Sequence, residues 1–149
     1  MQFPLSKTSF QDILAYIVAY ASSFFLVVVM LKLPYRLLKP KHLIDEFYQS
    51  GFAKNVIVEC FIVFIYLLVT ESIAYYLQFN NFTEKLVISV LVTIAFSALF
   101  IAYFTSQSRS MGFFSRFYRA TTWHATVYEV LFVFIVYCKY HHMIKFLSE

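Results

Sequence analysis

Five ionisable residues stand inside long apolar stretches of the chain, where a charge is costly. They are Glu59, Glu71, His124, Glu129 and Lys139. A charged side chain at the centre of a lipid bilayer costs about 2.5–3.5 kcal/mol to insert, so such residues are candidates for a function or for an ion pair. Depths estimated at ~1.5 Å per helical residue place Glu59 level with His124, with Arg119 in reach, and Glu71 near Lys139. We therefore predict two pairs, Glu59–His124 and Glu71–Lys139.

Glu129 is harder to explain, because the sequence places no basic residue, second acid or histidine at its estimated depth. One interpretation is a protonated or hydrogen-bonded glutamate that holds helices together. Another is a proton- or cation-handling site, in which Glu129 and Glu71 would serve a small transporter. A charge that faces a pore or a partner is the third.

The sequence contains no GxSxG, HExxH or P-loop motif. Its two cysteines, Cys60 and Cys138, have no CxxC spacing, and its four histidines are not placed for haem or zinc. We therefore expect no enzyme activity, no cofactor and no metal, and we identify no small-molecule substrate.

The composition excludes a soluble protein. The 149-residue chain is 61% hydrophobic and only 13% charged, with a mean hydropathy of +0.71, whereas a soluble domain is about half apolar and a quarter charged. The twelve Lys and Arg residues, which give a net charge of +4, lie mostly in short connectors. This placement favours contact with anionic lipid headgroups over contact with nucleic acid.

Four apolar runs are long enough to cross a bilayer, which takes about 20 helical residues. They cover residues 13–33, 56–79, 86–105 and 121–140. The runs contain no glycine or proline, and an unbroken helix is the simplest way to satisfy their backbone groups in lipid. We predict an all-α integral membrane bundle of four transmembrane helices, forming a single transmembrane domain over residues 1–149.

The orientation follows from the distribution of basic residues. The first and third connectors carry eight Lys and Arg residues, and the rest of the chain carries four. Both termini are therefore expected on the outer or lumenal side. Three of the basic residues in the third connector are candidates for contact with headgroups or a partner: Arg109, Arg116 and Arg119.

The two longer connectors each predict a short amphipathic helix. Residues 41–52 place aromatic and aliphatic side chains on one face and acids on another, and residues 113–119 combine aromatics with arginine. Such segments lie at the membrane interface. They would serve either as an aromatic girdle that anchors the bundle or as a docking surface for a partner or an acidic lipid.

Small residues recur every fourth position in the first and third spans, which lets helix backbones approach closely. The helix-packing residues are Ala15, Ala19 and Ser23 in the first span and Ser89, Thr93 and Ser97 in the third. We expect these two spans to form the tightly packed core. The Phe- and Tyr-rich faces of the second and fourth spans are then expected to meet lipid or other subunits.

Residues 113–129 run from an aromatic, basic segment into a helix with the aromatic–acid pair Tyr128-Glu129. This stretch resembles small multi-span membrane proteins of large double-stranded DNA viruses. The chain departs from that pattern, because those families often have a glycine near Thr122 or Trp123 and an aspartate at the position of Glu129. The resemblance implies a role in virion membrane architecture, beneath the capsid, with Arg116, Arg119 and Glu129 as structural anchors.

These observations favour a non-catalytic integral membrane subunit that builds or anchors a larger assembly with other membrane or capsid subunits. Alternatives are an accessory subunit of an organellar energy-transducing complex, the small transporter described above, or a lipid-acting enzyme. Transporters commonly break their helices at Gly or Pro. Here all of these residues lie outside the spans, which indicates a static bundle; they are Gly51, Gly112, Pro4, Pro34 and Pro40.

Overall fold

The computed structural model describes residues 10–39, 41–106 and 112–148, and every regular element within these ranges is a helix. Two of the helices continue directly into π-helical turns, α1 into η2 and α3 into η3. The elements are α1 (Phe10–Phe24), η2 (Phe25–Met30), α2 (Leu33–Leu37), α3 (Lys41–Asp45), η3 (Glu46–Ser50), α4 (Phe52–Tyr76), α5 (Phe82–Ser106), α6 (Phe113–Thr121) and α7 (Trp123–Ser148).

Four helical segments are long and apolar enough to cross a membrane, which confirms the predicted all-α membrane bundle. They are Phe10–Met30, Phe52–Tyr76, Phe82–Ser106 and Trp123–Leu147. The first ends earlier than predicted, because Lys32 adopts a left-handed conformation with φ of 49° before Pro34 opens α2. The fourth runs further than predicted. No helix-breaking residue follows Tyr140, and α7 continues through His141 and His142 to Ser148.

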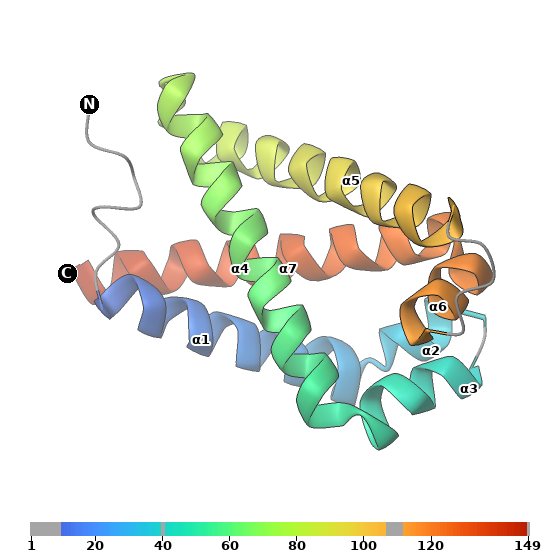
Figure 1. Cartoon of the computed structure of the whole chain (residues 1–149). Helices are drawn as coiled ribbons and strands as arrows, with labels where there is room; N and C mark the ends of the chain where they lie inside the picture. The colour runs from blue at the N-terminus through green and yellow to red at the C-terminus, as the bar shows by residue number, and fades with distance from the viewer. Residues whose placement is uncertain (1–9, 40, 107–111, 149) are drawn as a thin grey trace.

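The centre of the bundle is α7, with α1 and α5 lying along it (Figure 1). The six small residues singled out in the sequence are all at most 1% exposed, but they let α1 and α5 approach α7 rather than each other. The hydroxyls of Ser97 in α5 and Thr126 in α7, for example, lie 2.8 Å apart. The expectation that the first and third spans pack together is therefore wrong.

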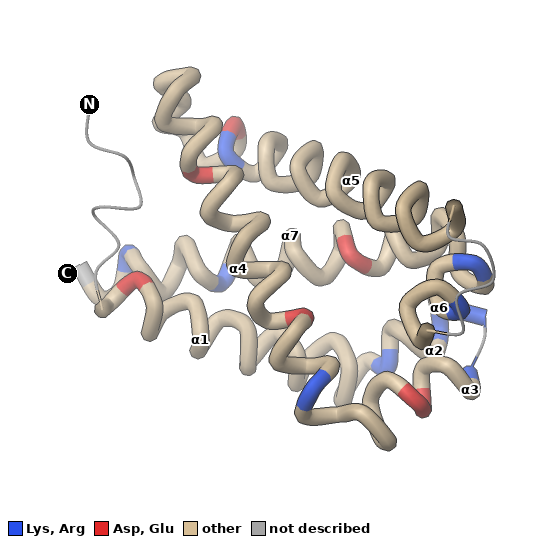
Figure 2. Tube along the Cα trace, in the orientation of Figure 1, with Lys and Arg blue, Asp and Glu red and all other residues tan. Residues whose placement is uncertain are grey.

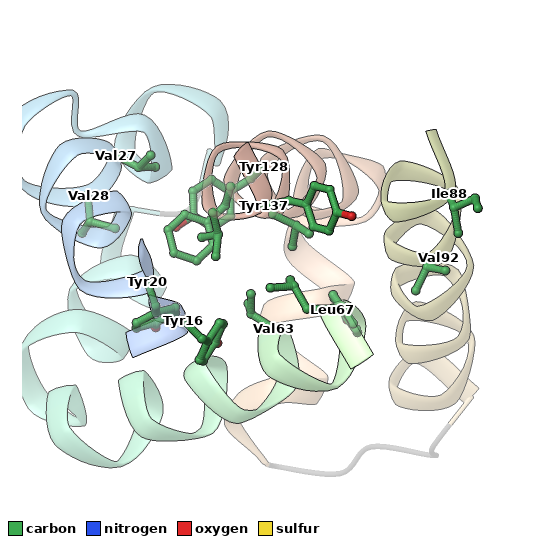
Figure 3. Close-up of a cluster of buried hydrophobic side chains, with 14 of the residues drawn as sticks. Tyr16, Tyr20, Val27, Val28, Val63, Leu67, Ile88, Val92, Tyr128 and Tyr137 are labelled. Carbon is green, nitrogen blue, oxygen red and sulfur yellow. The ribbon is translucent and has the colours of Figure 1, made fainter. Parts of the chain in front are cut away.

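The aromatic face of the fourth span is likewise inside the protein, and the expectation that it meets lipid is wrong. Tyr128, Phe132 and Tyr137 of α7 are at most 5% exposed. They point into a core that receives Tyr16 and Tyr20 from α1, Val63 and Leu67 from α4, and Ile88 and Val92 from α5 (Figure 3). A helix flanked on two sides by small residues can bury large side chains toward the third neighbour, α4.

In contrast, α4 crosses the bundle obliquely (Figure 1) and reaches α1 through long side chains rather than by close backbone approach. The Tyr16 hydroxyl donates to the Cys60 carbonyl oxygen at 2.5 Å, and the Tyr20 hydroxyl donates to that of Val56 at 3.2 Å. The Tyr16 ring also packs on Phe64, with centroids 4.9 Å apart. Tyrosines thus act as spacers that hold α4 away from α1.

The connector helices gather at the end of the bundle opposite the termini (Figure 1), as predicted from their amphipathic patterns. Their aromatic faces meet: the Phe47 ring lies 5.7 Å from that of Phe113, and Tyr118 stacks on Phe104 of α5 at 5.5 Å. The α6–α7 junction is at Thr122, whose φ of 48° is a conformation that favours glycine.

Candidate functional site

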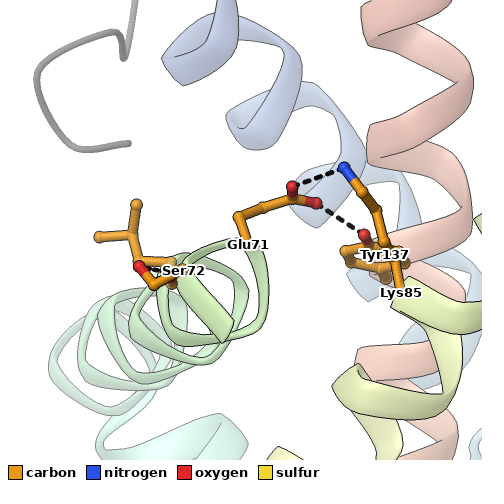
Figure 4. A network of polar contacts seen from close by, with 5 residues as sticks. Glu71, Ser72, Lys85 and Tyr137 are labelled. Carbon is orange, nitrogen blue, oxygen red and sulfur yellow. Dashed lines mark hydrogen bonds and ion pairs between the residues drawn. The ribbon is translucent and has the colours of Figure 1, made fainter. Parts of the chain in front are cut away.

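The first polar group inside the bundle joins three spans at the end that carries the termini. The Lys85 ammonium of α5 lies 2.9 Å from Oε2 of Glu71 in α4, and the Tyr137 hydroxyl of α7 donates to Oε1 at 2.6 Å (Figure 4). We call Glu71, Lys85 and Tyr137 the terminal-end group. The Glu71 carboxylate therefore contacts both a cation, Lys85, and a neutral hydrogen-bond donor, Tyr137.

The predicted Glu71–Lys139 pair is wrong. Lys85 stands in the first turn of α5, directly after the tight α4–α5 connection, and so reaches Glu71 from the adjacent helix. The Lys139 ammonium donates instead to Oγ of Ser22 in α1 at 3.3 Å. Depth alone could not distinguish two lysines that lie near the same end of the bundle.

The second polar group lies around a cavity at the connector end, between α4, α7 and the connector helices. The volume of the cavity is about 70 Å³. We call it the connector-end cavity. Its walls are mostly apolar or aromatic, and its polar lining residues are Asn55, Glu59 and Tyr66 of α4, Tyr128 and Glu129 of α7, Tyr48 of η3 and Tyr118 of α6.

Glu59 and Glu129 line the same cavity, which the sequence did not indicate. The Tyr20 hydroxyl donates to Oε2 of Glu59 at 3.2 Å, and the Tyr118 hydroxyl donates to Oε1 of Glu129 at 3.0 Å. Oε2 of Glu129 is fully buried and has no hydrogen-bond partner in the described part of the chain. Among the described residues, hydroxyl groups rather than cations therefore contact these two acids.

The predicted Glu59–His124 pair is also wrong, because the structure gives His124 other neighbours. Its Nδ1 lies 3.2 Å from the Thr121 carbonyl oxygen, and its ring stacks on Trp123 with centroids 3.9 Å apart. His124 is the second residue of α7 and directly follows the turn at Thr122. The backbone direction at this turn therefore determines where the His124 side chain lies.

Phenols outside the spans are held in their neutral form. Burial raises the pKa of Tyr118 and of Tyr48 well above the usual value for tyrosine. The hydroxyls of Tyr48 and Tyr128 lie 2.9 Å apart and bond to each other. The hydrogen bond from Tyr35 to Asp45, at 2.6 Å, raises the pKa of Tyr35. These phenols therefore remain hydrogen-bond donors at neutral pH.

Several basic residues lie along the connector helices (Figure 2). Arg116 of α6 forms an ion pair with Glu46 of η3 at 2.7 Å, and both side chains are partly exposed. This pair links the two connectors across the cavity's end of the molecule. Arg119 lies exposed in the last turn of α6, and Arg109 lies outside the described residues. Contact of these arginines with headgroups stays a prediction.

The chain was compared with protein-family models, with curated proteins and with solved structures, and none of them matched. What the geometry shows is a multi-pass integral membrane protein with two internal polar groups of different composition.

Proposed function

We propose that this protein is a non-catalytic integral membrane subunit that builds or anchors a larger membrane-associated assembly. The observation that carries this proposal is an apolar layer between the two polar groups. Phe132, Val133 and Val136 of α7 occupy this layer and are at most 2% exposed. Along α7, these apolar side chains separate Glu129 of the connector-end cavity from Tyr137 of the terminal-end group.

The continuity of the helices supports the same role. None of the four spans contains glycine or proline. The last turn of the first span is π-helical, but its hydrogen bonding continues, with the Leu31 amide donating to the Leu26 carbonyl oxygen at 2.9 Å. Transporters usually expose unwound backbone at the midplane. A bundle with continuous spans suits a fixed part of an assembly.

The outer faces of the spans offer large apolar side chains to lipid or to neighbouring subunits. Phe61 of α4 and Leu99 of α5 are 63% and 64% exposed. Trp123 is equally exposed at the connector end, where an aromatic side chain suits the membrane–water interface. These faces are the surfaces on which partner helices would pack.

The setting that we propose is the membrane beneath the capsid of a large double-stranded DNA virus, from the resemblance of residues 113–129. Arg116 and Glu129 would act there as structural anchors, which agrees with the Arg116–Glu46 and Tyr118–Glu129 contacts. An accessory subunit of an organellar complex is the alternative setting. In either one, the basic connectors would lie inside and both termini outside.

The transporter alternative relied on Glu129 and Glu71, and these acids lie in different polar groups. Glu71 is engaged by Lys85 and Tyr137, whereas Glu129 lines the connector-end cavity. A path between the two would have to cross the apolar layer around Phe132.

The test of the assembly role is purification of the tagged chain from its source membrane in a mild detergent, followed by native mass spectrometry. We expect stoichiometric membrane or capsid partners, and cross-links from the outer faces of α4 and α5. A monodisperse chain with no partner in its own membrane would contradict the proposal. The membrane fraction that yields the complex, virion or organelle, decides the setting.

A further inference from the structure

We propose that the connector-end cavity binds a small organic ammonium ion, held by Glu129 and Glu59 and surrounded by aromatic rings. This inference concerns a ligand site; it shares Glu129 with the proposed anchoring role, but ligand binding does not require the assembly. The starting observation is that Glu71 has a cation of the chain beside it, whereas the contacts to Glu59 and Glu129 come from hydroxyl groups.

The charge balance at the cavity is the first step. Two glutamates line it, and within the described residues the contacts to their carboxylates come from hydroxyl groups, those of Tyr20, Tyr118 and Ser97. A carboxylate removed from water costs several kcal/mol unless it is neutralised. A monovalent cation inside the cavity would balance the negative charge of one of the two acids, as Lys85 balances that of Glu71 at the other end of the bundle, and the other acid would then hold a proton.

The unpartnered oxygen is the second step. Oε2 of Glu129 is fully buried, lies on a side chain that lines the cavity, and has no partner among the described residues. Buried polar atoms in folded proteins nearly always have one. An N–H donor from a ligand in the cavity would satisfy this oxygen, and a charged donor would form the stronger bond.

The walls of the cavity select the class of cation. Aromatic rings attract cations over their faces, and they dominate this lining; they belong to Phe47, Tyr48, Tyr66, Phe114, Phe117, Tyr118, Tyr128 and Phe132. Aliphatic side chains such as Ile62 and Val63 fill much of the remaining wall. An ion with a charged head and a short apolar substituent matches both kinds of surface.

A metal ion fits less well. Hard cations such as Ca²⁺ take about six to eight oxygen ligands. Of the cavity's phenols, Tyr48 and Tyr128 bond to each other and Tyr118 donates to Glu129. The structure also brings together no group of three His, Cys, Asp or Glu side chains within residues 10–39, 41–106 and 112–148. The oxygen supply therefore favours an ammonium ion over a metal.

The probe that we would use is n-butylammonium, with n-butanol as a neutral analogue of the same length. Both are titrated into the purified native protein in nanodiscs, and binding is followed by calorimetry and by the shift in melting temperature. We expect saturable binding of n-butylammonium and at least tenfold weaker binding of n-butanol. Equal binding of the two compounds, or no saturable binding of the ammonium, would overturn the proposal without any variant.

Variants then locate the site. Glu129→Gln is expected to weaken n-butylammonium binding at least tenfold, and Glu59→Gln is expected to weaken it as well. Glu71→Gln, which alters an acid that already has Lys85, should leave binding unchanged. Each variant is first checked for folding by circular dichroism and gel filtration. A folded Glu129→Gln protein that binds as tightly as the native one, or displacement of the ammonium by equimolar Na⁺, would refute the site.

Discussion

The terminal-end group and the connector-end cavity both place acids between α4 and α7, but within the described residues only the first has a cation of the chain beside its acid. At the terminal end, the Lys85 ammonium and the Tyr137 hydroxyl together occupy the Glu71 carboxylate. At the connector end, phenols contact Glu59 and Glu129, and open space remains beside them. The first arrangement joins helices, whereas the second leaves room for a charge from outside.

The difference has a structural origin in α4. Its C-terminal end is tied to α5 by a short turn, so Lys85 is brought directly to Glu71. Its N-terminal end is held away from α1 by Tyr16 and Tyr20 and is preceded by connector helices instead of by a neighbouring span. The cavity lies where the helices diverge.

Phe132→Ala removes the main side chain of the layer that separates the two regions. Because Phe132 is 1% exposed, we expect the free energy of unfolding to fall by about 3 kcal/mol, as for a large-to-small change in a packed interior. The measurement is denaturant titration in mixed micelles. The matched control is Phe134→Ala on the same helix, where the side chain is 40% exposed and the loss should be below about 1 kcal/mol. Equal losses in the two variants would show that no packed layer exists.

Lys85→Met leaves Glu71 without its cation. We expect a loss of about 1.5 kcal/mol, less than for a fully buried pair because both side chains are partly exposed. Adding Glu71→Gln to the same protein should restore most of the loss. Glu129→Gln, measured without ligand in the same micelles, should cost less than about 0.5 kcal/mol because no cation of the described chain depends on it. The contrast between the regions fails if Glu129→Gln costs as much as Lys85→Met.

Tyr118 makes the stability sensitive to alkaline pH. Its folded-state pKa is raised by burial, so the folded protein holds this proton more tightly than the unfolded chain does. The corresponding stability is present below the unfolded pKa of about 10 and declines as the pH rises above it. Tyr118→Phe should reduce the alkaline loss by about 1 kcal/mol, as seen in melting temperatures measured against pH. Tyr103→Phe, at a tyrosine that is 58% exposed, is the control, and an identical change in both variants would contradict the prediction.

Arg116→Gln gives the smallest effect. The Arg116–Glu46 pair links the connectors beside the cavity but is partly exposed, so its loss should cost about 0.5 kcal/mol or less and should shrink at high salt. A double-mutant cycle with Glu46→Gln isolates the coupling between the two side chains. A coupling well above 1 kcal/mol would mean that the pair is shielded from water in the membrane.

Much of the fold followed from the sequence, because apolar length and helix periodicity are local properties. The spans and the connector helix over residues 41–50 are examples. The pairing of helices did not follow: the repeat of Ala15, Ala19 and Ser23 indicates a close approach but does not name the partner helix, which is α7. For the same reason the sequence identified Glu59 and Glu129 by type and depth, while the oblique crossing of α4 that brings both to one cavity could not be read from the chain.

The most direct test of the central claim, a static bundle with a closed apolar layer, is ion flux through the native protein in proteoliposomes. The assay follows a pH-sensitive dye and a cation-sensitive dye inside the vesicles under an imposed gradient. We expect proton and cation flux no greater than in protein-free vesicles, even where n-butylammonium binds at the cavity. Flux above that background that is abolished in Glu129→Gln would contradict the account and would favour a transporter.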